Sequence, residues 1–377
     1  MDTGKKTAVI VFLGNISFDT RCFNLRKSLE AEGIETTFIG FEWREKGFRT
    51  TVTESVKVYS LTKKYTSLFY YLKFYFLSAW HLFAGRYDYY FAEDVYTLPV
   101  VSFFCKLKKG RLFYDSRELF GFLAGLKGKK IKQNFWEGVE KRNIHKTDGV
   151  IVTGRMDGEF LIKQYGISED KIILLRNLPL YREITGVADL RAEHNIPQEA
   201  LLAIYQGVIV KGRGLDLIFR LLNSRPDLYL LVAGSGELLD EYKRKATESG
   251  AGESIIFTGN IPQEKLLELT AAADLGFALI ENLSVSYYYA LPNKMFEYIM
   301  AGVPAVVSNL PQMRQIIEEH DCGFVLDIER EYSEVISDFN SLIPGRDALE
   351  DKKEKCKAAA GVLCWENDFR NLKMRLG

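Results

Sequence analysis

The sequence predicts an α/β protein made of two successive Rossmann-like domains, and three observations support this prediction. Short apolar runs rich in β-branched residues recur along the chain, and segments with helical periodicity follow most of them. This alternation occurs on both sides of an irregular segment at residues 176–186. The length of 377 residues also exceeds what one hydrophobic core usually takes and suits two domains.

The composition predicts a cytoplasmic protein that binds no nucleic acid. Lys plus Arg and Asp plus Glu each number 50, so the chain lacks the basic excess of a nucleic-acid binder. The 5 cysteines form no C-x-x-C pair, which indicates reduced thiols and no zinc site. The apolar run near the start is too short for a signal peptide. We therefore expect neither secretion nor a bound metal.

The first domain opens as a βαβ unit. Residues Thr7–Leu13 suit a buried strand, Asp19–Gly33 a helix, and Thr36–Gly40 a second strand. The loop after the first parallel strand lies at the carboxyl edge of such a sheet, where ligands bind. We therefore expect Gly14 and Asn15 to line a ligand cleft.

Residues 63–86 are rich in aromatic side chains and are flanked by basic residues. Lys73 interrupts the apolar run, so the segment does not suit a membrane span. The favoured interpretation is a mostly buried crossover helix that leads into a strand at Tyr89–Phe91. The alternative is a helix at a membrane surface, which would place the protein at the inner face of the membrane.

The strands expected at Tyr89–Asp94 and Arg111–Ser116 both end in charged residues. Since parallel strands end at one edge, the following charged side chains should gather there: Glu93, Asp94, Asp115, Arg117 and Glu118. Such a density of charge favours a functional site. The alternative for Asp115 and for Glu118 is a helix cap.

The loop at residues 125–132 carries four lysines, which are Lys127, Lys129, Lys130 and Lys132. Most lysine runs are simply solvated, but one at a ligand-binding edge could meet an anionic acceptor or lipid.

The first domain is expected to comprise residues 1–180 and the second residues 181–352. Strands at Gly149–Val152 and Lys171–Leu175 complete the first domain. The second domain repeats the alternation with strands at Leu201–Tyr205, Leu228–Ala233, Ser254–Thr258 and Leu275–Ala278 and helices at Leu215–Leu222, Leu238–Ser249 and Gln263–Ala272.

The first turn of the second domain is rich in glycine and cations. It reads YQGVIVKGRGLD and places Lys211 and Arg213 among glycines. Glycines let the backbone approach a phosphate closely, and the two cations can neutralise a departing diphosphate. Gly234, after the next strand, is expected near a nucleotide base or its phosphates. The alternative is an ordinary turn with exposed cations.

Residues 291–308 read LPNKMFEYIMAGVPAVVS and predict a helix, a tight turn and a strand. Pro292 suits the first helical position, and Gly302 should end the helix after about three turns. Asn293, Lys294 and Glu297 share one face of this helix. The opposite face is apolar.

The amino end of this helix is suited to an anion such as a diphosphate. Its unpaired N–H groups and partial positive charge favour anions, and Lys294 adds a full charge. Glu297, one turn further on, could accept hydrogen bonds from the two hydroxyls of a ribose. The alternative is an ordinary amphipathic helix with solvated charges.

Taken together, these motifs resemble glycosyltransferase family 4. The resemblance spans nearly the whole chain and is carried by AEDVYTLP, YDSRELF, G-x-x-x-K-G-R-G, AGSGE, FTGNIP and, most specifically, LPNKMFEYIMAGVPAVVSNLPQMRQII. It implies two Rossmann-like domains that face each other across a cleft (GT-B type). The second domain would hold the nucleotide sugar and the first the acceptor, with retention at the anomeric carbon and no metal or other cofactor.

The resemblance also implies roles for individual residues. Glu297 would bind the ribose, and Lys211 and Arg213 the diphosphate. The backbone around Asn260, at residues 258–261, would meet the base. Residues 353–377 would form a final helix that packs on the first domain.

Two positions depart from the family pattern. Tyr289 stands where the family has the first of two paired glutamates, so Glu281 or the loop Ser284–Tyr288 could take over its contact with the donor sugar. Arg117 stands where similar chains have histidine. Because arginine stays protonated, Arg117 cannot act as a base, but it could hold an acceptor carboxylate or phosphate.

The resemblance implies transfer of a sugar from a nucleoside diphosphate sugar to a hydroxyl of a glycan or a lipid-linked glycan, in polysaccharide or glycoconjugate biosynthesis. Arg213, Lys211 and Arg117 are the candidate catalytic residues. Two alternatives remain: an inert binding or scaffold protein on the same fold, and a nucleotide-sugar epimerase.

Overall fold

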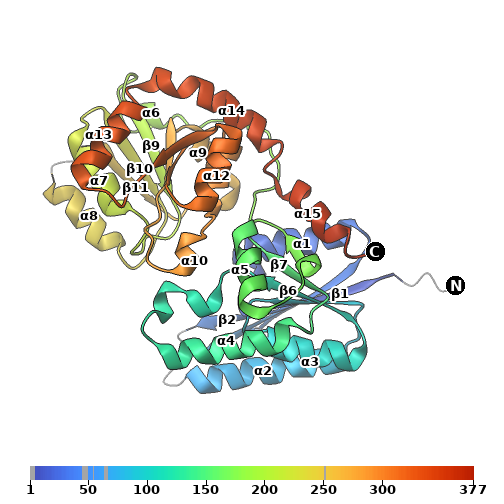
Figure 1. Cartoon of the computed structure of the whole chain (residues 1–377). Coiled ribbons are helices and arrows are strands. Elements are labelled where there is room, and N and C mark those ends of the chain that lie inside the picture. Colours follow the sequence, from blue (N-terminus) through green and yellow to red (C-terminus); the bar gives the residue numbers. More distant parts are fainter. Residues whose placement is uncertain (1–4, 45–49, 54, 63–66, 250–251) are drawn as a thin grey trace. The chain divides into compact units, whose positions relative to one another are not determined.

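The computed structural model describes residues 5–44, 50–53, 55–62, 67–249 and 252–377 (Figure 1). These residues form two compact units. Unit 1 comprises residues 1–176 and 369–377, and unit 2 comprises residues 177–368. The sequence placed the boundaries at residues 180 and 352, whereas the structure includes residues 353–368 in unit 2.

Unit 1 is built on a sheet whose strand order is β3-β4-β2-β1-β5-β6-β7-β8 over the described residues. All its pairs are parallel except the antiparallel pair β3/β4. The strands are β1 (Thr7–Phe12), β2 (Glu35–Arg44), β3 (Thr50–Val52), β4 (Val56–Thr62), β5 (Tyr89–Glu93), β6 (Arg111–Ser116), β7 (Gly149–Val152) and β8 (Ile172–Leu174). The sequence did not predict β3 and β4.

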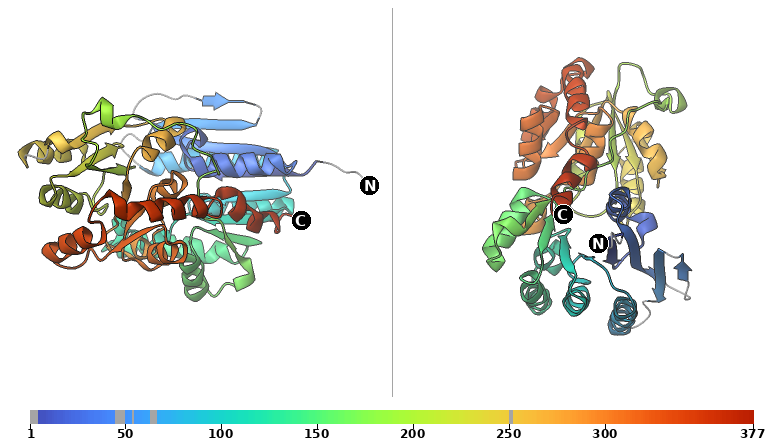
Figure 2. Two further views of the ribbon diagram at one scale, coloured as in Figure 1. Left: turned by 90° about the horizontal axis from the view of Figure 1, so that it is seen from above. Right: turned by 90° about the vertical axis from the view of Figure 1, so that its right-hand side faces the viewer.

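The helices of unit 1 cover both faces of this sheet. They are α1 (Thr20–Ala31), α2 (Ser67–Ala84), α3 (Leu98–Lys108), α4 (Lys130–Ile144), α5 (Arg155–Tyr165) and α15 (Trp365–Lys373), whose first turn belongs to unit 2. Helices α2, α3 and α4 lie side by side on one face, and α1 lies on the other (Figures 1 and 2). This division follows from right-handed crossovers, because the chain moves in opposite directions along the sheet through α1 and through α2.

Helix α2 corrects the expectation of a mostly buried crossover helix. It does connect two strands of the sheet, and it buries Tyr70, Phe74 and Leu82. However, Phe76 and Trp80 are 70% and 64% exposed. A sheet covers only one side of a helix, so a helix that is apolar all round leaves its outer side in solvent. Residues 63–66 of the predicted segment lie outside the described residues.

A buried ion pair connects α1 to β6. Arg21 Nε and Nη2 donate to the two carboxylate oxygens of Asp115 at 2.6 and 2.9 Å, and Nη1 donates to the carbonyl of Leu175 at 2.8 Å. Both side chains are 1% exposed. Asp115 is therefore not a helix cap, because its carboxylate binds the guanidinium of a helix on another part of the chain.

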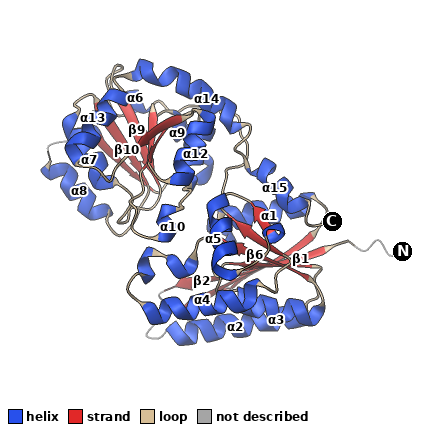
Figure 3. Cartoon of the chain, in the orientation of Figure 1, coloured by secondary structure: helices blue, strands red, loops and turns tan. Residues whose placement is uncertain are grey.

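Unit 2 is built on an all-parallel sheet of order β11-β10-β9-β12-β13-β14 over the described residues (Figure 3). The strands are β9 (Leu201–Gln206), β10 (Leu228–Ala233), β11 (Ile255–Gly259), β12 (Leu275–Ala278), β13 (Ala305–Ser308) and β14 (Gly323–Leu326). The order reverses between β9 and β12, which makes this pair the topological switch point of the sheet.

The helices of unit 2 lie between or after these strands. They are α6 (Leu190–Glu193), α7 (Leu215–Ser224), α8 (Leu239–Glu248), α9 (Gln263–Ala271), α10 (Val285–Tyr288), α11 (Asn293–Met300), α12 (Pro311–His320), α13 (Tyr332–Leu342) and α14 (Glu350–Ala360). Short 3₁₀ helices occur at Ile16–Phe18, Phe120–Phe122, Ala124–Leu126, Glu169–Lys171, Gly252–Ser254 and Arg346–Leu349.

Helix α11 begins one residue later and is shorter than the sequence predicted. Pro292 is the N-cap, with an extended backbone at ψ 136°, and the helix spans 8 residues rather than about three turns. Gly302 follows its end with a φ of 71°. Its apolar side packs as expected, since Met295, Phe296 and Ile299 are buried.

We predict that Arg21→Met destabilises unit 1 by about 3 kcal/mol or more, because Asp115 would remain as a buried charge without its partner. Differential scanning calorimetry should show the loss as a lower Tm. Arg26→Met is the matched control, since the pair of Arg26 with Glu30 is partly exposed to solvent, at 23% and 42%, and contributes about 1 kcal/mol or less. Equal Tm values for the two variants would contradict a structural role for the buried pair.

Candidate functional site

The strongest candidate site lies at the carboxyl ends of β9 and β12 in unit 2. Open parallel sheets bind ligands at the point where the strand order reverses. The loops at residues 207–214 and 279–292 leave the sheet here, and α11 begins directly after the second loop. The structure thus brings the glycine-rich turn and the predicted diphosphate helix to one edge.

Glu297 is held by a buried amide. The Nε2 of Gln206, at the end of β9, donates to Glu297 Oε2. Gln206 Oε1 in turn accepts from Thr270 Oγ1 at 2.8 Å, and the backbone N–H of Gln206 donates to Tyr298 Oη at 3.1 Å. These contacts fix one carboxylate oxygen of Glu297. Sequence reasoning missed Gln206, although a polar residue at the end of an apolar strand was a visible signal.

Lys294 is buried, which argues against the alternative of an ordinary amphipathic helix with solvated charges. The residue is 9% exposed, and its Nζ lies 3.6 Å from the ring centroid of Tyr205. Its Nζ has no hydrogen-bond partner among the residues that the structure describes. Burial, and then the positive charge of Arg213, lower the pKa of Lys294 well below its usual value, while Glu297 opposes this shift. An anion at this position would remove the cost of the unpaired charge.

The two cations of the glycine-rich turn differ in their surroundings. Arg213 is half-buried, and its guanidinium carbon lies 5.1 Å from the ring centroid of Tyr287. Lys211 is exposed. Gly214 has a φ of 70°, and a Cβ there would lie 2.4 Å from Cβ of Leu279. Only glycine therefore lets the turn lie against the loop that follows β12.

The remaining donor-side candidates lie around this turn. Gly234 has a φ of 157°, and a Cβ there would lie 1.9 Å from the carbonyl oxygen of Gly207, so the loops after β9 and β10 touch. Asn293 begins α11 and is exposed, as is Asn260 after β11. The carbonyl of Tyr289 accepts from Gln312 Nε2 at 2.5 Å.

The loop proposed to replace the missing glutamate lies near the glycine-rich turn. The backbone N–H of Glu281 donates to the carbonyl of Gly212 at 3.1 Å. Residues Val285–Tyr288 form the short helix α10. The guanidinium of Arg213 stacks on the ring of Tyr287 in this helix.

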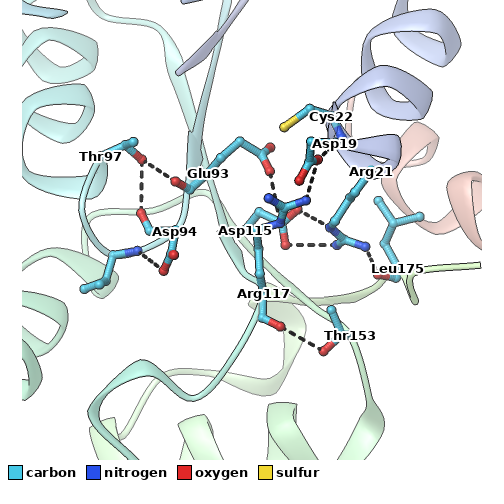
Figure 4. Close-up of polar contacts among 11 residues, drawn as sticks. Asp19, Arg21, Cys22, Glu93, Asp94, Thr97, Asp115, Arg117, Thr153 and Leu175 are labelled. Atoms are coloured by element: carbon cyan, nitrogen blue, oxygen red, sulfur yellow. Dashed lines mark hydrogen bonds and ion pairs between the residues drawn. The ribbon is translucent and has the colours of Figure 1, made fainter. Parts of the chain in front are cut away.

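A second cluster of charges lies at the carboxyl edge of the unit 1 sheet (Figure 4). Arg117 Nη2 donates to Asp19 Oδ1 at 2.6 Å, and its Nε lies 3.9 Å from Glu93 Oε2. The guanidinium also stacks on Phe12, with 4.6 Å between its carbon and the ring centroid. Arg117 is therefore held by acidic and aromatic groups of its own unit, and it remains 16% exposed.

Two acids of this cluster hold protons more tightly than usual. Glu93 is fully buried, its carboxylate oxygens have no hydrogen-bond partner in the described residues, and burial followed by the charge of Asp115 raises its pKa well above the usual value. Burial raises the pKa of Asp94 to about 7, although its Oδ1 accepts from the N–H of Val95 at 2.7 Å. Asp94 also has a φ of 73°, a strained conformation that is enriched at functional sites.

Other predicted residues of unit 1 make structural contacts. The side chain of Asn15 donates to Glu42 Oε2 at 2.7 Å and accepts from the N–H of Ser17 at 3.0 Å, and the carbonyl of Gly14 accepts from Phe41 N–H at 2.9 Å. Leu119, rather than Glu118, is the N-cap of the next 3₁₀ helix. The lysines of the loop at residues 125–132 are all exposed: Lys127, Lys129, Lys130 and Lys132.

The described residues show neither a metal-binding cluster nor a membrane-spanning helix. They contain no group of three or more His, Cys, Asp or Glu side chains arranged to hold a metal ion. Within the same residues, no helix has the length and apolar character needed to cross a membrane.

We predict that Asp94→Asn changes how stability depends on pH. Between pH values of about 4 and 7 the folded wild-type protein keeps the Asp94 proton while the unfolded chain loses it, so wild-type stability falls as pH rises. Asparagine tolerates a positive φ and does not titrate. The Tm of the variant relative to wild type should therefore be about 4–8 °C higher near pH 8 than near pH 5. A difference that stays constant with pH would exclude this titration.

Comparisons with known proteins add the following findings. Residues 187–360 match the family model described as "Glycosyl transferases group 1". A D-inositol 3-phosphate glycosyltransferase of Streptomyces scabiei is 24% identical over 218 residues, which cover 53% of this chain and 48% of that protein. An alpha-galactosylglucosyldiacylglycerol synthase of Streptococcus pneumoniae is 25% identical over 199 residues, or 49% of this chain and 51% of that one. The chain thus spans about half the length of these curated relatives.

The fold comparison covers the whole chain. The structure of Anabaena HepE in complex with UDP superposes with a TM-score of 0.72, covering 98% of this chain and 99% of that one at 13% identity. This likeness shows a shared fold of two Rossmann-like α/β domains. The resemblance to glycosyltransferases is confirmed at the level of the sequence match, since residues 187–360 match the group 1 glycosyl transferase model and the curated relatives are glycosyltransferases.

Proposed function

We propose that this protein is a retaining glycosyltransferase that moves a sugar from a nucleoside diphosphate sugar to a hydroxyl acceptor. The observation that carries the proposal is the buried ammonium group of Lys294, which lacks a hydrogen-bond partner in the described residues at the amino end of α11. A buried amine without a hydrogen-bond acceptor is costly, and it is retained where function uses it.

The diphosphate of the donor binds at the amino end of α11. Lys294 and Arg213 lie at this edge, and the exposed Lys211 reaches the same ligand. The N–H groups of the first helical turn, which begins at Asn293, add donors that favour an anion.

Glu297 binds the two ribose hydroxyls. Gln206 occupies one of its carboxylate oxygens and holds the group in a fixed orientation. A carboxylate has further acceptor sites, which suit a vicinal diol. Backbone groups near Gly234 and Asn260 contact the base. That HepE was solved with UDP supports uridine nucleotides as the first donors to test.

In the transition state the bond between the anomeric carbon and the diphosphate breaks, and the electron pair passes to the phosphate oxygen. Fixed cations at that oxygen stabilise the developing charge. Because Lys211, Arg213 and Lys294 supply this charge, the proposed reaction uses no metal ion or other cofactor. Activity that survives a chelator would support this part of the proposal.

The acceptor binds at the charged edge of unit 1, near Gly14, Asn15 and Arg117. We propose a glycan or lipid-linked glycan as acceptor, and hence a role in polysaccharide or glycoconjugate biosynthesis. The similarity to a glycosyldiacylglycerol synthase supports a lipid-linked acceptor. The proposed location is the cytoplasm, with contact at the inner face of the membrane.

A second candidate is an inert binding protein on the same fold. Tyr289 replaces an expected carboxylate, and Arg117 is engaged by Asp19 and Glu93 of its own unit. Turnover of any nucleotide sugar that requires Glu297 would exclude this candidate.

We predict that Arg213→Ala lowers kcat by ~10²–10³, which is the usual loss for one preorganised charge donor. The assay measures release of nucleoside diphosphate from UDP-, GDP- and ADP-sugars. In the same assay, Glu297→Ala should raise KM, because it removes a contact with the ribose. Arg220→Ala is the control, since Arg220 is an exposed cation of the same unit that stacks on Tyr332 at 4.1 Å. Unchanged turnover in Arg213→Ala would remove Arg213 from the mechanism.

Retention at the anomeric carbon has a test of its own. Slow hydrolysis of the donor releases the sugar, and the anomeric NMR signal of that sugar shows whether the configuration is retained.

We predict opposite effects of Lys294→Met on stability and on binding. The variant should have a higher Tm than wild type without ligand, because it removes a buried amine that has no hydrogen-bond partner in the described residues. Saturating UDP or GDP should raise the wild-type Tm by several degrees and should leave the Tm of the variant unchanged. At a hundredfold excess of nucleotide over Kd, binding raises the free energy of unfolding of the wild type by about 2.7 kcal/mol. Lys211→Met, at an exposed position, is the control for basal stability. A nucleotide shift that persists in Lys294→Met would refute the proposed phosphate contact.

A further inference from the structure

The outer side of α2 carries a continuous stripe of exposed apolar side chains. Its members are Phe69, Leu72, Phe76, Trp80 and Phe83, and each is between 54% and 70% exposed. Their spacing of three and four residues places them on one face of the helix. The helix contains one Lys, Lys73, and no Asp or Glu.

This stripe does not hold the fold together. The opposite face of α2 makes the contacts with the sheet, where the ring of Phe74 meets that of Phe41 at a centroid distance of 4.8 Å. Tyr70, Phe74, Ser78 and Leu82 are buried on that face. A helix at a protein surface normally carries polar residues on its outer side, so an apolar outer side indicates contact with something else.

Helix α3 extends the apolar surface. Phe103 and Leu107 are 64% and 56% exposed. Lys108, the last residue of α3, contacts the end of α2. Its Nζ donates to the carbonyl of Phe83 at 2.8 Å and lies 5.3 Å from the centroid of the Phe83 ring. Figure 2 shows the two helices side by side on the same face of the sheet. We name this surface the α2–α3 face; it comprises the stripe of α2 together with Phe103 and Leu107.

The charged residues within α2 and α3 have one sign. Helix α3 contains Lys106 and Lys108 and, like α2, no Asp or Glu. Lys109 follows α3 directly. Basic residues among exposed aromatic and aliphatic side chains form the pattern of a surface that lies in the headgroup region of an anionic membrane.

We propose that the α2–α3 face docks on the surface of an anionic lipid bilayer, with both helices parallel to the membrane plane. The aromatic and aliphatic side chains enter the boundary between headgroups and acyl chains, and the lysines bind lipid phosphates. A second copy of the chain fits less well, because a symmetric contact would bring the same lysines against each other. This inference rests on unit 1 alone and does not depend on the proposed sugar transfer.

The test is sedimentation of the full chain with vesicles of phosphatidylcholine alone and of phosphatidylcholine mixed with anionic phosphatidylglycerol. We expect binding to the mixed vesicles and little to the neutral ones. The double variant Phe76→Ser/Trp80→Ser should weaken binding about tenfold or more, because it removes two of the largest inserted side chains. Lys73→Glu and Lys106→Glu should each weaken it about fivefold or more.

The matched control is Phe23→Ser/Met374→Ser. Both residues are exposed apolar side chains of unit 1. Phe23 lies on α1, which covers the other face of the sheet, and Lys373, next to Met374, pairs with Glu32 at the end of α1. Since all the substituted side chains are exposed, the variants should keep the wild-type Tm, which calorimetry checks.

Three outcomes would overturn the proposal. The first is no binding to anionic vesicles. The second is equal loss of binding in the control and in Phe76→Ser/Trp80→Ser. The third is a change of oligomeric state in Phe76→Ser/Trp80→Ser without a change in vesicle binding, which would assign the face to a second copy of the chain.

Discussion

The site depends on one constraint, which is that parallel strands joined by right-handed crossovers all end at the same edge of their sheet. In unit 2 this constraint places Gln206, at the end of β9, against Glu297 on α11, which is 91 residues further along the chain. It also places the turn that carries Arg213 against the loop after β12, through the close approach of Gly214 to Leu279. Gln206 and the turn that carries Arg213 therefore reach the site through contacts that are distant in sequence.

The buried basic side chains of the two units differ in the partners that they contact. In unit 1 the guanidinium of Arg21 is fully matched by Asp115 and a backbone carbonyl, so the pair can be buried without an unpaired charge. In unit 2 the ammonium group of Lys294 has an aromatic ring beneath it and no hydrogen-bond acceptor within the described part of the chain. The first arrangement serves stability, whereas the second leaves a buried amine without an acceptor, and the proposed function assigns an anionic ligand to it.

Local pattern was enough to predict most of the fold. Continuous apolar runs identified strands such as Leu228–Ala233, and Gly302 correctly marked the end of α11. The pattern failed for β3 and β4, because their residues mix polar and apolar side chains and lack the continuous apolar run that marks central strands. It also failed for the outer face of α2, because an apolar helix surface does not reveal whether anything covers it.

The sequence by itself determined the alternation of strands and helices, the glycines that the turns require and the presence of Lys294 and Glu297 on one short helix, since these depend on local backbone preferences and spacing. Only the tertiary structure decided which charges are matched. It buried Lys294 over Tyr205, paired Asp115 with Arg21, and gave Glu297 the amide of Gln206. The physical reason is that the energy of a charge depends on its solvation and on partners from distant strands, and spacing along the chain encodes neither.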